Sequence, residues 1–516
     1  MNRFYITTAI DYPNSLPHLG TAYEKIGADV LARYHRMLGD SVHFQMGNDE
    51  HSVKVKKAAL ELNLDPKAYC DSMKEKFIAT WKNLGVSFDD FIQTSEPRNK
   101  TATLKLFTLL QKKGDVYKGS YEGWYCEGCE AFYLDKDLVD GLCPAHKAKP
   151  KWLKEDNYFF KLSHYADSIK QHILAHPHFI LPEIRRNEIV AFIEQGVEDI
   201  SISRSGSDWG VPVPGDEKQF IYVWFDALVN YLAAVKFGEK DDHLFKTLWP
   251  ADIHVIGKDI TRFHCIIWPA MLMSAGLPLP KTIFGHGFVY LKGERMSKTL
   301  GNIVSPMEIV EKYGPDALRY YLLRESSFGA DSNFTWEGFI KRYNSDLAND
   351  LGNLLNRTLG MAKKYFDGLI ENGRAETENL DYDLLHRHGL EAGKRIHELM
   401  DYQNGDLNFH QALASLWQFI SQCDKYINDM APWSLKKQGK AERLKDFTVT
   451  LVLALRLIAT YIRPFLPHTS DKIFAQLKFP VPHNFEEVET FSNIKLPHQL
   501  GEASPLFPRI ELEAKT

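Results

Sequence analysis

The chain has 516 residues, of which 44% are hydrophobic and 25% are charged, and its formal net charge is −5. This length is too great for one ordinary core and predicts three or four structural units, while the composition is that of a soluble globular protein. A negative net charge excludes nucleic-acid binding by bulk charge, so any RNA-binding surface must be a local basic patch.

The N-terminal residues lack the basic segment, long apolar run and small-residue cleavage site of a signal peptide. The most apolar stretch, 447–466, is interrupted by Arg456, Arg463 and Pro464, which is typical of a buried helix and not of a membrane span. Six cysteines are too few for a disulfide framework, and three of them lie near one histidine, which indicates metal in a reducing compartment. We therefore expect a cytoplasmic protein that crosses no membrane.

The first part of the chain predicts a strand–helix–strand unit. Residues 4–10 are apolar and β-rich, a turn-rich stretch follows at 11–17, and apolar residues then recur at helical spacing from Thr21 onward. Residues 42–46 alternate as a strand does and end at the polar string Gly-Asn-Asp-Glu-His, 47–51. These polar residues fall where strands end, as expected at the binding edge of a parallel sheet.

Residues near 117–155 are rich in Gly, Tyr, Cys and Lys and predict a small inserted module. Within it, Cys126-x2-Cys129 and Cys143-x2-His146 are two short-spaced ligand pairs that can close a tetrahedron around Zn²⁺. Four protein ligands leave no open position for water, so we expect one structural zinc ion per chain. The alternative is three unrelated cysteines and a surface histidine.

The strand–helix pattern returns at 253–259 and 282–290, and from about 335 onward the sequence is almost wholly helical. The predicted fold class is therefore α/β: a Rossmann-type parallel-sheet domain, split by a zinc-bearing insert and followed by an α-helical bundle. We expect the two halves of the α/β domain at 1–116 and 221–290, with the insert at 117–220.

Two loops have the composition of phosphate-binding segments. His18 and Gly20 precede the first helix, whose start offers free backbone N–H groups and partial positive charge, and glycine permits close approach. Residues 293–299 follow a late strand and include Lys298, which could reach the β and γ phosphates of a nucleotide. Each loop alone is weak evidence, because turn histidines and solvated basic loops are common.

Together, His-Leu-Gly-Thr at 18–21 and Arg-Met-Ser-Lys-Thr at 295–299 resemble the two motifs of class I aminoacyl-tRNA synthetases, His-Ile-Gly-His and Lys-Met-Ser-Lys-Ser. The strings at 47–51, 222–227 and 256–264 are similar to the methionine pocket of the methionyl-tRNA synthetases, and the similarity covers essentially the whole chain. The resemblance implies an ATP-dependent ligase that converts L-methionine to methionyl-adenylate. It then transfers the methionyl group to the 3′ end of tRNA(Met), including initiator tRNA, for initiation and elongation.

The resemblance also implies roles for individual residues. The implied catalytic residues are His18, Lys298 and Thr21, with Mg²⁺ accompanying ATP. The implied ATP-binding residues are His18, Gly20, Thr21, Gly257, Asp259, Arg295 and Lys298. Those implied for methionine are Asp49, which would hold the α-ammonium, and the pocket residues Ile10, Tyr12, Trp224, Ala227, Leu228, Tyr231, Ile260 and His264. Thr21 departs from the family motif, which usually has a second histidine there.

The chemistry of the pocket fits this substrate. Trp224, Ala227, Leu228 and Tyr231 share one helix face by their spacing, although such residues are more often core. A thioether is apolar and polarizable, so aromatic walls can recognise it by dispersion and sulfur–ring contact. We expect Tyr12 and His264 to be the polar groups that could touch the sulfur.

The helical region carries an RNA-binding hypothesis. Asn353 and Arg357 are four apart on one helix, and Trp433 follows Ala-Pro at the end of another. An amide, a guanidinium and an indole can read and stack unpaired bases, and these strings resemble the anticodon-reading positions of the family. The resemblance implies a stem-contact region at 291–345 and an anticodon-binding domain at 346–516. A nearby basic cluster is either a phosphate contact or a solvated face: Lys436, Lys437, Lys440, Arg443 and Lys445.

Alternatives within the class are synthetases for isoleucine, valine, leucine or cysteine. The branched-chain enzymes need a much larger editing insert, and a cysteine enzyme needs an open metal site at its substrate. Outside the class, a small-molecule adenylyltransferase would not need the helical bundle, and a non-catalytic zinc-bearing RNA-binding protein would leave Lys298 without a role. Since no further RNA-binding domain follows the bundle in this sequence, we expect a monomer.

Overall fold

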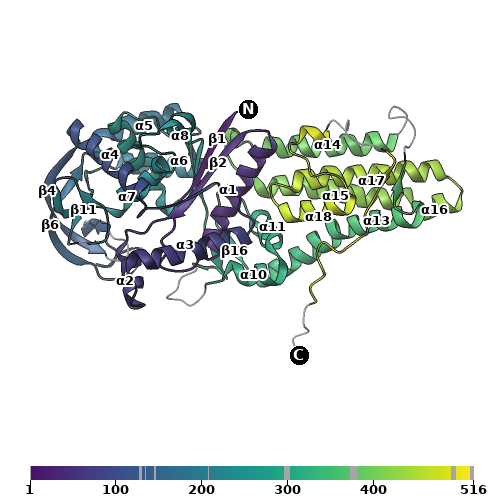
Figure 1. Cartoon of the computed structure of the whole chain (residues 1–516), viewed down its shortest axis with the longest axis horizontal. Coiled ribbons are helices and arrows are strands. Elements are labelled where there is room, and N and C mark those ends of the chain that lie inside the picture. The colour runs from purple at the N-terminus through teal and green to yellow at the C-terminus, as the bar shows by residue number, and fades with distance from the viewer. Residues whose placement is uncertain are drawn as a thin grey trace.

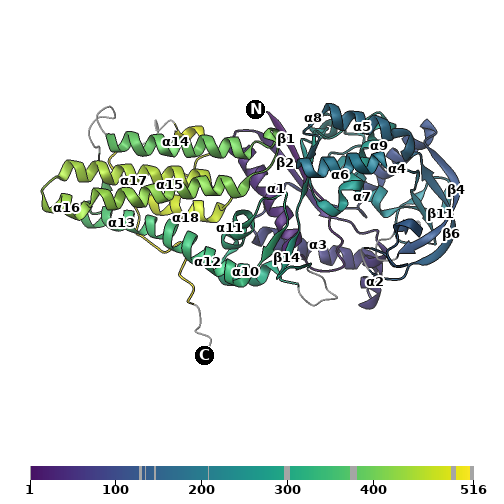
Figure 2. The same cartoon turned by 180° about the vertical axis from the view of Figure 1, so that it is seen from behind.

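The structure is a computed structural model and describes residues 2–126, 131–133, 135–144, 147–206, 208–295, 303–371, 380–489 and 496–511. The molecule is elongated: an α/β part occupies one end and a bundle of long helices the other, with the insert strands β4, β6 and β11 farthest from the bundle in both views (Figures 1 and 2). The predicted order of sheet and bundle is therefore confirmed.

The centre of the α/β part is a six-stranded parallel sheet. In sheet order its strands are β3 (Asp90–Gln93), β2 (Ser41–Asn48), β1 (Arg3–Thr8), β12 (Ile253–Gly257), β13 (Thr282–His286) and β7 (Ile180–Leu181). Strands β12 and β13 are buried along their whole length, as expected where helices cover both faces of a parallel sheet. The accompanying helices are α1 (Leu19–Met37), α2 (Val53–Glu61), α3 (Pro66–Asn83), α4 (Pro97–Lys113), α7 (Val223–Ala233), α8 (His243–Leu248) and α9 (Trp268–Ala275).

Strand order reverses beside β1. The chain adds β2 and β3 on one side of β1, whereas β12 and β13 pair on the other side. Ligands of open parallel sheets bind beyond the carboxyl ends of the strands at such a switch point. Local sequence and strand order therefore place the first turn of the chain, the start of α1 and the end of β12 at the same edge of the sheet.

The region between β3 and α7 forms antiparallel sheets on the outer end of the α/β part. One has the order β5-β4-β6-β8 and the other β10-β11-β9. Residues 180–181 of this region add strand β7 to the central sheet beside β13. The elements are β4 (Val116–Cys126), β5 (Ala131–Tyr133), β6 (Lys151–Phe160), α5 (Ala166–Ala175), α6 (Glu183–Glu194), β8 (Ile200–Ser201), β9 (Ser203–Ser205), β10 (Pro212–Val213) and β11 (Asp216–Ile221).

Beyond β13 the chain passes through a small sheet and short helices into the bundle. The connecting elements are β14 (Val289–Leu291), β15 (Glu294–Arg295), α10 (Pro306–Tyr313), α11 (Pro315–Glu325), β16 (Ser332–Phe334), α12 (Trp336–Arg342) and a π-helix (Tyr343–Gly352). The bundle comprises α13 (Asn353–Phe366), α14 (Leu380–Met400), α15 (Phe409–Met430), α16 (Pro432–Lys437), α17 (Ala441–Ile462), α18 (Pro467–Leu477) and α19 (Glu486–Glu489), with a two-stranded sheet of β17 (Leu369–Ile370) and β18 (His498–Gln499). None of the helices in the described ranges is both long and apolar enough to cross a membrane.

A buried ion pair joins the α/β part to the bundle. Arg319 Nη2 of α11 lies 2.7 Å from Asp29 Oδ2 of α1, and both side chains are fully buried. The same guanidinium donates to the carbonyl oxygens of Pro464 and Phe465, which follow α17. Because α1 begins at the predicted phosphate site, this contact fixes the bundle against the helix that carries the site.

Candidate active site

The start of α1 is capped by the ring of His18. His18 Nδ1 accepts hydrogen bonds from the backbone N–H groups of Gly20, at 3.0 Å, and Thr21, at 3.4 Å. The sequence predicts free backbone N–H groups here for a phosphate, but in the structure these two N–H groups already donate to the His18 ring. Since backbone amides can only donate, Nδ1 must be the acceptor nitrogen, and the ring proton of the neutral imidazole is on Nε2.

The His18 ring explains why residue 20 is a glycine. A Cβ on residue 20 would lie 2.9 Å from His18 Cε1 and 3.1 Å from Nδ1. Any larger residue would therefore push the imidazole off the helix start. The sequence predicts that this glycine lets a ligand approach the backbone closely. The structure shows that it also leaves room for the His18 ring.

Below this helix start lies a buried charged network that the sequence analysis did not identify. Lys25 Nζ, fully buried, donates to the carbonyl of Ala9 at 2.8 Å and lies 2.6 Å from Glu24 and 3.1 Å from Asp11. Glu24 Oε2 in turn lies 3.0 Å from Nε2 of His286, at the end of β13. Burial raises the pKa of Asp11 to about 6, against the opposing effect of Lys25. The available signal was the presence of charged residues in a helix that is buried on nearly every side.

This network joins the strand ends on both sides of the switch point. Lys25 holds the segment after β1, which contains Ile10 and Tyr12, against α1, and Glu24 holds the end of β13. The two predicted subsites, for the phosphates and for the amino acid, therefore share one rigid support.

The aromatic residues predicted for the amino-acid pocket lie together. The ring of Trp224 stacks on Phe263, with centroids 3.9 Å apart, and Tyr12 meets Trp224 edge-on at 6.5 Å. Tyr231 OH lies 2.7 Å from Nε2 of His264. The structure thus brings Tyr12, Trp224, Tyr231 and His264 together from three separate segments, and Phe263 joins them by stacking on Trp224.

The hydrogen bonds of His264 decide its chemistry. Its Nδ1 lies 3.0 Å from the carbonyl oxygen of Ile260, which can only accept, so Nδ1 carries the proton and Nε2 accepts from Tyr231 OH. Burial lowers the pKa of His264 to about 4, so the ring is neutral near pH 7. Both ring nitrogens are engaged, so His264 offers an apolar ring surface to a ligand and not the polar contact expected from the sequence. A π-helix at Phe263–Ile267 sets this ring position, as π-bulges often do at functional sites.

The remaining predicted pocket residues vary in burial. Asp49 is 2% exposed and follows β2, and its backbone N–H donates to the carbonyl of Asp11 at 2.9 Å. Ile10 is half-buried and lies close enough to Gly47 that a Cβ there would come within 2.9 Å of its Cγ2. Ala227 and Leu228 are buried on α7, and Leu228 belongs to the hydrophobic core.

A second polar cluster lies behind this pocket. His51 Nδ1 is 2.6 Å from Oδ2 of Asp226, whose Oδ1 accepts from Asn99 at 2.9 Å and Thr103 at 2.8 Å. The ring of Trp209 meets His51 edge-on at 5.3 Å. Sequence spacing assigned none of these residues a role, because they come from four separate segments.

The residues predicted to bind the nucleotide lie only partly within the described ranges. Gly257 ends β12 opposite His286, and a Cβ on it would lie 2.7 Å from Oδ1 of Asp259. The backbone of Arg295 pairs with Tyr290 in the hairpin of β14 and β15. Lys298 lies outside the described residues.

Two of the four predicted zinc ligands lie within the described residues. Cys126 ends β4 and pairs with Ala131 of β5, and its side chain is buried. Cys143 is also buried, its backbone N–H donates to the carbonyl of Ala148, and its own carbonyl accepts from the backbone N–H of Lys147. Cys129 and His146 lie outside the described residues. Among the residues that are described, no three metal-ligating side chains cluster.

The predicted RNA-reading residues gather near one end of α15. Arg357, on α13, donates to Oδ1 of Asp424 at 3.2 Å and to Oδ1 of Asn428 at 3.0 Å. Asn353 is exposed on the same helix. Ala431, with φ +43°, makes the sharp turn from α15 into α16, where Trp433 is 53% exposed.

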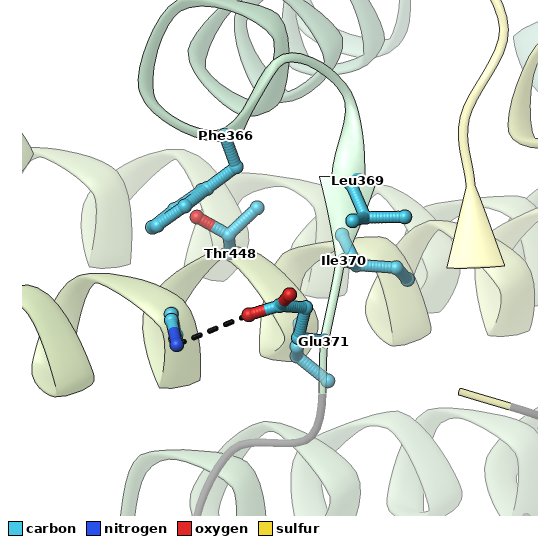
Figure 3. A pocket seen from close by; sticks show the side chains of 7 residues that line it. Phe366, Leu369, Ile370, Glu371 and Thr448 are labelled. Carbon is cyan, nitrogen blue, oxygen red and sulfur yellow. Dashed lines mark ion pairs between the residues drawn. The ribbon is translucent and has the colours of Figure 1, made fainter. Parts of the chain in front are cut away.

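A cavity of about 110 Å³ lies elsewhere in the bundle, between the end of α13, β17 and α17 (Figure 3). Its rim includes an ion pair of 3.1 Å between Lys445 and Glu371. Lys445, one of the basic cluster noted in the sequence, is thus paired. None of the residues that line this cavity belongs to the candidate site at the carboxyl ends of the central strands.

Comparison with known proteins agrees with this geometry. A family model described as class I tRNA synthetases (M) matches residues 4–151 and 137–359, and one described as the anticodon-binding domain of tRNA ligase matches 393–502. The methionine–tRNA ligases of Caldanaerobacter subterraneus subsp. tengcongensis and Thermotoga maritima are 45% and 43% identical to it, over 99% of this chain and 79% and 80% of their own length. The chain belongs to the methionyl-tRNA synthetase family. It is therefore a class I methionine–tRNA ligase with an anticodon-binding domain.

Solved structures of the family support the fold. Mycobacterium tuberculosis methionyl-tRNA synthetase in complex with methionyl-adenylate superposes with a TM-score of 0.92 at 38% identity, covering 99% of this chain and 100% of that one. The free form of the same enzyme gives 0.85 at 36% identity, covering 99% of each chain.

Proposed function

We propose that this chain forms methionyl-adenylate at the crevice between β1 and β12 and charges both initiator and elongator tRNA(Met). The observation that carries the assignment is the meeting of a histidine-capped helix start with an aromatic pocket at the switch point of the sheet. The reaction we assign is in-line attack of the methionine carboxylate on the α-phosphate of ATP, with release of pyrophosphate. The 3′-terminal ribose hydroxyl of tRNA then attacks the activated carbonyl.

For ATP, we assign His18 as the donor to the α-phosphate and Lys298 as the cation that meets the leaving pyrophosphate. Catalysis then consists mainly of positioning and charge stabilisation, because phosphoryl chemistry asks little covalent help from a protein. Mg²⁺ accompanying ATP would neutralise phosphate charge. The proposed nucleotide contacts are His18, Gly20, Gly257, Asp259, Arg295 and Lys298.

For methionine, we assign Asp49 to the α-ammonium. A buried carboxylate beside an ammonium group gives a charge-assisted hydrogen bond. The wall that faces the thioether is aromatic and, with His264 neutral, carries no charge of its own, which suits a polarizable sulfur and disfavours charged side chains. The proposed wall is Ile10, Tyr12, Trp224, Ala227, Leu228, Tyr231, Ile260 and His264.

We also propose that Cys126, Cys129, Cys143 and His146 hold one structural zinc ion. The described half of this set fits a metal, because both thiols are buried in an outer module, where thiolates would need a cation. Bound there, zinc would supply folding energy to the insert and no catalysis.

We assign anticodon reading to Asn353, Arg357 and Trp433. An exposed indole at a bundle end can stack on an unpaired base. Arg357 donates to Asp424 and Asn428 of α15, and these two partners lie a few residues before Trp433 in the sequence. On this basis we propose catalytic halves at 1–116 and 221–290, an insert at 117–220, a stem-contact region at 291–345 and an anticodon-binding domain at 346–516. Reduced thiols and a tRNA substrate agree with a cytoplasmic location. A monomeric state remains a prediction.

The test is exchange of labelled pyrophosphate into ATP, run with each of the twenty amino acids on the wild type and on Lys298→Ala. We expect exchange with methionine alone and its near loss in the variant. Exchange driven by another amino acid would refute the assigned pocket, and full exchange in Lys298→Ala would refute the assigned phosphate loop.

A further inference from the structure

Thr21 stands where the family motif usually has a second histidine, and the structure shows what its hydroxyl does. Thr21 Oγ1 accepts from the backbone N–H of His18 at 3.0 Å and lies 2.8 Å from the carbonyl oxygen of His18. With the contact from its own backbone N–H to His18 Nδ1, Thr21 touches His18 at three atoms. The arrangement is a capping box with threonine as its third helical residue.

These contacts oppose a phosphate-binding role for the hydroxyl. A hydroxyl has one proton to donate, and the Thr21 hydroxyl donates it to the carbonyl oxygen of His18, one helical turn back. A phosphate could take that proton only if the His18 carbonyl lost it. The hydroxyl oxygen also accepts from the backbone N–H of His18.

We infer that Thr21 is the positioning residue of His18: it fixes the backbone of His18 so that the ring stays on the helix start and Nε2–H is the donor presented to the α-phosphate. This inference rests on the proposed function of His18. Two supports hold the ring in this pose, the amides of Gly20 and Thr21 on Nδ1 and the absence of a Cβ on Gly20. Thr21 holds the backbone from which the ring projects.

In this arrangement the start of α1 acts on a ligand through the His18 ring and not through direct backbone contact. The amides at the start of α1 polarise the imidazole through Nδ1, and the imidazole passes that polarity to a ligand through Nε2–H. A ring flipped about the Cβ–Cγ bond would put Cδ2 at the place of Nδ1 and Cε1 at the place of Nε2. A loss of order at His18 therefore removes both the acceptor for the two amides and the N–H donor presented to the ligand.

The experiment is a double-mutant cycle on methionine-dependent pyrophosphate exchange. Thr21→Val keeps the shape and removes the hydroxyl, Thr21→Ser keeps the hydroxyl, and His18→Asn keeps an N-cap oxygen but lacks the Nε2–H donor. Thr108→Val is the matched control, since Thr108 Oγ1 donates to the carbonyl of Leu104 within α4, outside the site.

We expect Thr21→Val to lower kcat about 10- to 100-fold, a part of the roughly 10²- to 10³-fold effect of removing a donor that acts in the transition state, with little change in the KM for methionine. Thr21→Ser and Thr108→Val should stay within about threefold of the wild type, as expected for variants that keep the bond or act elsewhere. In the His18→Asn background, Thr21→Val should add nothing, because a residue that acts through His18 has no second effect once the donor is gone.

The outcomes separate the inference from the function on which it rests. Multiplicative effects of Thr21→Val and His18→Asn would mean that Thr21 meets the substrate itself, which overturns the inference. Wild-type kcat in Thr21→Val combined with loss in His18→Asn would also overturn it, while leaving the role of His18 intact. Full exchange in His18→Asn would instead refute the proposed role of His18.

Discussion

Arg319→Met should destabilise the protein by about 4 kcal/mol, because removing one partner of a buried ion pair costs roughly 3–5 kcal/mol. The Arg319 and Asp29 side chains are fully buried, and Nη2 and Oδ2 are 2.7 Å apart. Arg319 also donates to the carbonyl of Phe465 at 2.7 Å, and that acceptor would be left without its donor, which adds about 1 kcal/mol. Arg33 lies 2.8 Å from Asp29 and remains as its partner in the variant. The loss of stability should therefore stay below the upper end of the range for a broken buried pair.

Removing both charges should cost less than the two single changes together. In Asp29→Leu combined with Arg319→Met no buried charge is left unpaired, so we expect a coupling energy of about 2 kcal/mol or more. Arg33→Met is the matched control: Arg33 pairs with the same carboxylate but its side chain is 22% exposed, so its removal should cost about 1 kcal/mol.

The assay is urea unfolding of the full chain, followed by fluorescence and by circular dichroism so that separate unfolding of the bundle is visible. Pyrophosphate exchange on the same variants tests whether the junction also supports the start of α1. A cost below about 1 kcal/mol for Arg319→Met, or single costs that simply add, would refute the reasoning that a desolvated pair joins the two parts.

Three further predictions follow from single sites. His264, whose folded pKa is about 4 against 6.5 unfolded, should lower the stability of the wild type relative to His264→Gln as pH falls from 6.5 to 4. The unfolded chain binds that proton first, so the difference should reach about 3 kcal/mol, and a pH-independent difference would contradict it. Cys143→Ser should lower zinc content, measured by atomic emission, from about one ion per chain to well below half, since a structural site needs all four ligands; unchanged content would exclude Cys143 as a ligand. Trp433→Ala should reduce kcat/KM for tRNA charging about 10- to 100-fold by loss of base stacking and leave exchange unaltered, and equal loss of both would indicate misfolding.

Sequence patterning anticipated much of the fold because local rules fix it. Alternating and helical spacing of apolar residues predicted β1, α1, β2, β12, β13 and the helical bundle, and the polar string at 47–51 marked where a strand ends. The His-x-Gly turn was recognised as a helix start for the same reason, since its contacts span only a few residues. The proposed methionine wall was predicted by similarity of strings, and helix spacing alone would have left those residues as core.

Only the tertiary structure shows which buried charged and polar groups pair when they lie far apart along the chain. Lys25 reaches Ala9 and Asp11 across the switch point, and Arg319 meets Asp29 from a different part of the fold. A buried charge is tolerated only where several donors and acceptors converge, and no sequence window contains that convergence. The neutral state of His264 likewise depends on its burial, which lowers its pKa and which distant segments of the chain provide. The sequence therefore determined which chemical groups are present and where the elements begin, whereas packing determined their protonation and which hydrogen bonds they have left for a substrate.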